Sequence, residues 1–181
     1  MDLKIEIEHS TAHRPVRDKI SGFVLEHTEH FKLLLDLGLD VSDKNHHKAW
    51  WTLELVLESD IGLIRRYLDE FTDSLNRFTD ESALRSISKI CLFMAMKQFR
   101  RGEKDDFATD EQLQKIASAA FDWLIDDRKV ATKAYAMRTL FLLGKRYDWI
   151  YPDLKEVLSK DFPYHSAGYK AAARQLLLKL R

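Results

Sequence analysis

The chain has few of the residues that interrupt helices or cross-link a small fold. Its 181 residues include one cysteine, three prolines and six glycines. A single cysteine cannot form an intrachain disulfide, which argues against a disulfide-stabilised secreted scaffold and makes a reducing cytoplasm the simplest location. So few glycines and prolines leave little material for the many turns of an all-β fold.

Long apolar runs are also missing. The run Cys91–Met96 is followed at once by Lys97, and no run approaches the roughly 18 residues of a membrane-spanning helix. The first residues, MDLKIEIEHS, carry acids early and no apolar stretch. We therefore expect neither a membrane span nor a secretory signal.

Helix-forming residues fill the chain instead, and their periodicity predicts one all-α domain over residues 14–181. Leu3, Ile5 and Ile7 alternate with charged residues, so we predict that residues 1–13 form an extended or poorly ordered N-terminal arm. Gly38 is predicted to end the second helix, and Thr109 with Gln112 predicts a capping box. The expected helices cover about 16–27, 29–37, 43–58, 61–77, 80–99, a segment that begins after Thr109, 129–143, 149–159 and 165–180, with a charged loop over 100–108.

Two stretches of the chain are similar to each other. KAWWTLELVLESD, from Lys48, aligns with KAYAMRTLFLLGKRYD, from Lys133, at an offset of 85 residues. That offset is two units of about 40–47 residues, the period of HEAT and armadillo repeats. With Arg85 and Arg174 in later helices, these motifs make the chain resemble the HEAT-repeat superfamily over about nine-tenths of its length.

The resemblance implies a right-handed α-α superhelix of about four to five helical hairpins, and a tendency to bind proteins. It implies no catalytic residue. The sequence contains no G-x-G-x-x-G, P-loop, H-E-x-x-H, G-x-S-x-G or C-x-x-C motif. We therefore expect a non-enzymatic scaffold or adaptor with no catalytic site and no cofactor.

Histidines and the cysteine are the residues most able to suggest a metal or a nucleophile. His27, His30 and Glu26 could converge on one side of a helix. Only fragments of a di-metal motif are present, so we interpret these histidines as solvated surface residues and expect no metal site. Cys91 lies among Ile90, Leu92 and Phe93, a core-like setting that does not activate a thiol.

A second resemblance gives an alternative function. Trp50-Trp51 followed by Glu54 is similar to the aromatic and acidic residues of HEAT-like alkylpurine DNA glycosylases. This resemblance implies a DNA-binding or DNA-repair protein with a nucleic-acid site at Trp50, Trp51 and Glu54. The chain departs from that family because it has Glu in place of Asp, only one such pair and no net charge. The alternative interpretation places Trp50 in the core.

Charge is distributed unevenly along the chain. Residues 1–127 contain 17 Lys or Arg and 25 Asp or Glu, whereas residues 128–181 contain 12 and four. This asymmetry favours a basic C-terminal face that binds an acidic protein surface, with nucleic acid, a second copy of the chain or simple solvation as alternatives. We expect a monomer or weak homodimer. The candidate partner-binding residues are Arg128, Lys129, Lys133, Arg138, Lys145, Arg146, Lys170 and Arg174.

Overall fold

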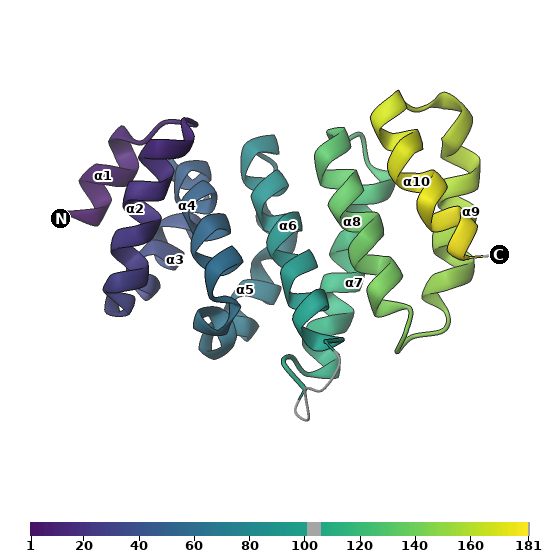
Figure 1. Ribbon diagram of the computed structural model, residues 1–181, viewed down its shortest axis with the longest axis horizontal. Coiled ribbons are helices and arrows are strands. Elements are labelled where there is room, and N and C mark those ends of the chain that lie inside the picture. Colours follow the sequence, from purple (N-terminus) through teal and green to yellow (C-terminus); the bar gives the residue numbers. More distant parts are fainter. Residues whose placement is uncertain (101–105, 181) are drawn as a thin grey trace.

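The structure is a computed structural model that describes residues 1–100 and 106–180. Within these ranges the chain is all-helical, with ten α-helices, four 3-10 segments and no strand (Figure 1). The α-helices are α1 (Leu3–His9), α2 (Arg14–Glu26), α3 (Phe31–Leu39), α4 (His46–Ser59), α5 (Leu68–Ser74), α6 (Glu81–Gln98), α7 (Asp110–Ile125), α8 (Val130–Leu143), α9 (Ile150–Asp161) and α10 (Ala167–Lys179). The 3-10 segments are η1 (Thr28–His30), η2 (Ile61–Tyr67), η3 (Leu75–Arg77) and η4 (Phe162–Tyr164).

The helices form two layers. In the even layer, α2 contacts α4, α4 contacts α6, α6 contacts α8 and α8 contacts α10. The odd layer, formed by α3, residues 61–77, α7 and α9, packs behind it, with α3 on α4 and both α7 and α9 on α8. The chain therefore crosses from one layer to the other at successive connections.

The even-numbered helices all run in the same direction. In Figure 1 each begins in the upper part of the view and runs downward, with α10 ending near mid-height, while the intervening odd elements return the chain. Residues at equivalent heights on neighbouring even helices therefore share one region of the surface.

Apolar side chains at helical spacing hold the layers together. On α6, Leu84, Ile87, Cys91 and Met94 follow spacings of three and four residues, and all four are fully buried. Residues three or four apart share one side of a helix, and each buried Leu, Ile or Met side chain contributes roughly 1.5–3 kcal/mol to stability. One core cluster joins residues from α1 through α10.

The predicted N-terminal arm is instead the helix α1, which packs against α2, α3 and α4. Leu3 and Ile7 are buried, whereas Ile5 between them is 54% exposed. An apolar residue at every second position also satisfies the i, i+4 spacing of a helix, so the alternation did not specify a strand. Asp2 caps this helix by accepting hydrogen bonds from the backbone nitrogens of Lys4 and Ile5.

Two local predictions had opposite outcomes. The capping box of Thr109 and Gln112 is present at the start of α7. The prediction that Gly38 ends a helix is wrong, because α3 continues to Leu39. Gly38 instead allows close packing: a Cβ atom there would lie 3.1 Å from the Trp50 ring. Of the predicted loop over 100–108, residues 101–105 lie outside the described residues.

Candidate functional site

Trp50, proposed above as part of a nucleic-acid site, belongs to the core. Its side chain is fully buried, and its Nε1 donates a hydrogen bond of 2.7 Å to the carbonyl oxygen of Gly38. Its ring packs near Phe71 and Phe78. Trp51 is partly exposed and contacts His47 edge-on. A buried and hydrogen-bonded indole cannot stack on a base, so only Trp51 of the pair is accessible.

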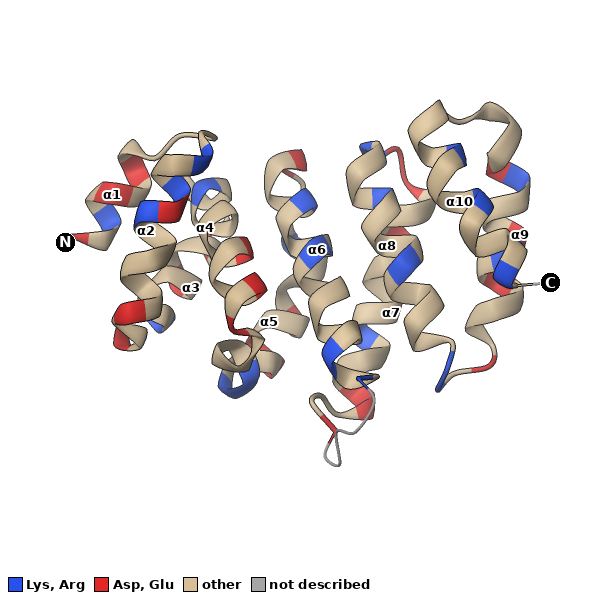
Figure 2. Ribbon diagram, viewed as in Figure 1, with Lys and Arg blue, Asp and Glu red and all other residues tan. Residues whose placement is uncertain are grey.

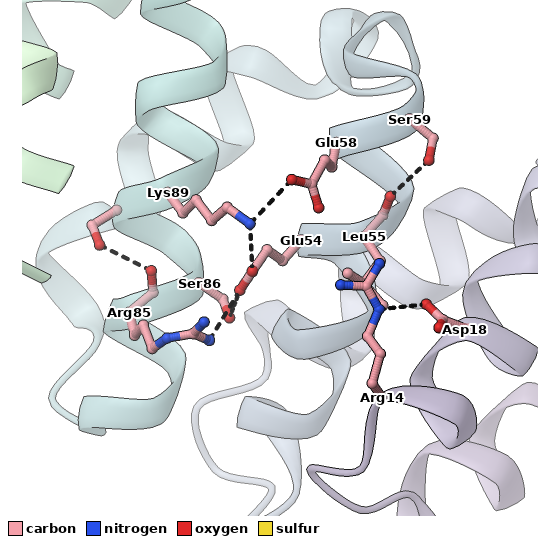
Figure 3. Close-up of polar contacts among 10 residues, drawn as sticks. Arg14, Asp18, Glu54, Leu55, Glu58, Ser59, Arg85, Ser86 and Lys89 are labelled. Carbon is pink, nitrogen blue, oxygen red and sulfur yellow. Dashed lines mark hydrogen bonds and ion pairs between the residues drawn. The ribbon is translucent and has the colours of Figure 1, made fainter. Parts of the chain in front are cut away.

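Glu54 is buried between α4 and α6, where three side chains of α6 donate hydrogen bonds to it (Figure 3). The donors are Ser86 Oγ at 2.7 Å, Lys89 Nζ at 2.9 Å and Arg85 Nη1 at 3.3 Å. A buried carboxylate is tolerated only when it is paired and hydrogen-bonded in this way. Glu54 therefore clamps two helices of the even layer together and is not available to a substrate.

Lys89 bridges two carboxylates of α4. Besides Glu54 it contacts Glu58 at 3.3 Å, and its side chain is only 18% exposed. Burial alone would lower the pKa of Lys89, but the hydrogen bonds and charges of Glu54 and Glu58 outweigh burial and raise it. A nucleophilic lysine needs a lowered pKa, so Lys89 acts as a charged structural link.

The other candidates for chemistry have ordinary environments. Burial raises the pKa of the Cys91 thiol, and the side chain is inaccessible. His27 lies 3.7 Å from Glu29 and packs with Phe23 and His30. Across residues 1–100 and 106–180, no three His, Cys, Asp or Glu side chains are close enough together to hold a metal ion.

Three of the eight predicted partner-binding residues interact with other parts of the fold instead. The prediction is wrong for Lys133, which is buried; its Nζ donates a 2.7 Å hydrogen bond to the carbonyl oxygen of Leu124 near the end of α7. It cannot contact a partner, because it lies on the inward side of α8. Arg128 and Arg146 reach acidic side chains instead: Glu81 and Asp126 for the first, Asp106 and Asp110 for the second.

The other five predicted residues remain at the surface. Arg138 lies on α8, and Lys170 and Arg174 lie on α10, which contacts α8. Neither helix contains an acidic residue, and these three form no ion pair within the described part of the chain. Lys129 occupies the position before α8 without a side-chain capping hydrogen bond, and Lys145 lies just beyond the end of α8, 5.8 Å from the centre of the Phe99 ring.

Basic and acidic residues are distributed unevenly between the two layers, as they are along the chain. Helices α6, α8 and α10 together carry eight Lys or Arg and one Asp or Glu, whereas α2 and α4 carry four of each. The odd layer carries seven basic and ten acidic residues. Figure 2 shows the basic residues on α6, α8 and α10 and acidic ones on α4 on the same side of the molecule. We call the outward side of these three helices the basic face; it carries Arg85, Lys89, Arg138, Lys170 and Arg174.

Apolar side chains lie next to the basic face, toward the ends of the same helices. On α6, Phe93 and Met96 follow Arg85 and Lys89 at spacings of three or four residues. Met96 and Leu178 are each 56% exposed, and Leu142 is partly exposed. We call Phe93, Met96, Leu142 and Leu178 the apolar band; it was not predicted, although the spacing from Arg85 to Met96 carried the signal.

An open groove of about 440 Å³ extends the apolar band between α4 and α6. Phe93 and Met96 line one side, and Leu57 and Ile61 line the other. The charged residues Glu58, Lys97 and Arg100 also line it. The groove can accommodate an apolar side chain beside charged groups.

Comparison of the chain with protein-family models, with curated proteins and with solved structures gave no match. In the described ranges no helix has the length and apolar character needed to cross a bilayer.

Proposed function

We propose that the chain is a non-enzymatic, HEAT-like scaffold or adaptor, a right-handed superhelix of helical hairpins that binds another protein on its even layer. The alternation of the chain between two layers supports this architecture, and stacked hairpins offer an extended binding surface. Arg138, Lys170 and Arg174 carry the proposal, because they are cations on adjacent helices without acidic neighbours on those helices.

The absence of acidic residues from α8 and α10 supports a role of these cations in binding rather than in folding. Elsewhere in the even layer, Arg14 pairs with Asp18 and Lys19 pairs with Glu6. A group of like charges repels itself and contributes little to stability, but it attracts an oppositely charged partner and accelerates the encounter.

Quantitative affinity purification from a cytoplasmic extract tests the proposal. The double variant R138E/R174E should recover at least about tenfold less of the bound partner. The matched control is K155E/K160E, which makes the same charge change on exposed residues of α9 in the odd layer and should recover the partner fully. Equal recovery by both variants would remove the basic face from consideration.

Nucleic-acid binding is the second candidate, and the excess of eight basic over one acidic residue on α6, α8 and α10 favours it. Two residues of the predicted nucleic-acid site are buried: Trp50 lies in the core, and Glu54 joins α4 to α6. A DNA-binding function would therefore depend on the basic face. A gel-shift assay at about 50 mM salt tests it, because counterion release makes phosphate binding strongest at low salt. No shift of a DNA duplex at that salt concentration would exclude this candidate.

A further inference from the structure

The basic face and the apolar band run side by side across three helices because α6, α8 and α10 are parallel. On each of these helices, cations precede exposed or partly exposed apolar residues by three or four positions: Lys89 precedes Phe93, Arg138 precedes Leu142, and Arg174 precedes Leu178. One further lysine follows the apolar residues at the ends of α6 and α10, Lys97 and Lys179. In Figure 1 the three helices run in the same general direction, so this order repeats along each of them. The result is two adjoining bands, one basic and one apolar.

We propose that these two bands dock an acidic amphipathic segment of a partner protein, with its carboxylates on the basic face and its apolar side chains on the apolar band. This inference rests on the proposed scaffold function and specifies the chemistry of the partner. Charge complementarity selects acidic residues, and the groove beside Phe93 and Met96 receives an apolar side chain.

The apolar band favours a protein segment over a nucleic acid as the occupant. Contacts to phosphates come from cations, hydroxyl and amide side chains and backbone N–H groups. The C-terminal half of α6 instead presents Phe93 and the 56% exposed Met96. Covering these side chains with another apolar surface is favourable, because it removes them from water.

Some cations of the basic face form ion pairs within the fold, and others do not. Lys89 and, in part, Arg85 are held by Glu54. Arg138 and Arg174 form no ion pair in the described residues, and the Arg174 guanidinium lies 5.8 Å from the centre of the Phe162 ring. The acidic residues of the bound segment therefore meet Arg138, Lys170 and Arg174, while its apolar residues lie on the apolar band.

Fluorescence anisotropy with defined peptides tests the inference. The probe is a labelled peptide of about 16 residues with leucine on one side of a helix and glutamate beside it. A second peptide has glutamine for every glutamate, and a third has serine for every leucine. The first peptide should bind at least about tenfold more tightly than either of the others.

Variants of the chain locate the site. R138E/R174E and Met96→Glu should each weaken binding of the first peptide by at least about tenfold, whereas K155E/K160E should leave it unchanged. Melting temperatures close to that of the parent chain would show that the variants are folded, because every substituted residue is exposed.

Three results would overturn the inference: no binding of the first peptide, equal binding of all three, or binding that is insensitive to Met96→Glu. If a cellular partner is still lost from R138E/R174E in the purification, the scaffold function stands and only the partner's chemistry is wrong. If a DNA duplex binds through Arg138 and Arg174 while no peptide does, both proposals fail.

Discussion

The α4–α6 junction and the α8–α10 pair belong to the same layer, yet their cations have different environments. At the junction, Arg85 and Lys89 contact the buried carboxylate of Glu54. On α8 and α10, Arg138 and Arg174 have no acidic neighbour on either helix. The number of basic residues on a helix is thus a poor guide to binding; the surrounding acids decide whether a cation holds the fold together or faces a partner.

The largest expected loss of stability is on the buried side of α8, and almost none is expected on its exposed side. Leu140→Ala should lower the free energy of unfolding by about 2–5 kcal/mol, because Leu140 is fully buried and its loss leaves a cavity. Arg138→Ala, on the exposed side, should change it by less than about 0.5 kcal/mol. Urea denaturation measures both. A loss under about 1 kcal/mol for Leu140→Ala would mean that the helix faces are misassigned.

A smaller effect is expected at the junction. Glu54→Ala should cost about 2–3 kcal/mol of unfolding free energy, below the range for fully buried pairs because Arg85 keeps much of its exposure. Glu58→Ala is the matched control, since it removes an exposed carboxylate from the same Lys89, and it should cost less than about 1 kcal/mol. Equal losses in the two variants would contradict the clamp.

The smallest effect distinguishes the buried lysine of α8 from a lysine at the surface. Lys133→Met should cost about 1–2 kcal/mol, because the carbonyl oxygen of Leu124 loses its buried donor. Lys170→Met on α10 should be neutral within about 0.5 kcal/mol. If thermal and urea unfolding rank these two variants in the opposite order, the hydrogen bond from Lys133 to Leu124 does not stabilise the fold.

The sequence predicted most of the helices because long amphipathic periods are a local signal. It failed at α1, where seven residues satisfy both the period of a strand and the spacing of a helix. It failed at Gly38, where the role of glycine is set by Trp50, twelve residues away. Contacts between distant segments are absent from local patterns.

The candidate site was predicted only in part, for the same reason. Composition located an excess of basic residues after residue 127, but not which of them are paired. Arg146 lies 40 residues from Asp106, and Lys89 lies 35 residues from Glu54; such pairings become visible only once the layers are assembled. The inward position of Lys133 could have been found, since it shares helical spacing with the buried Ala136, Met137 and Leu140.

The parallel arrangement of α6, α8 and α10 also sets a length scale. Packed helices lie about 8–10 Å apart, so the distance from α6 to α10 is about 16–20 Å. A partner helix of about 11–13 residues, at 1.5 Å per residue, spans that distance, and an extended strand does so with about five or six residues. A segment much shorter than this reaches only two of the three helices. The spacing of the helices therefore sets a minimum length for a segment that contacts all three.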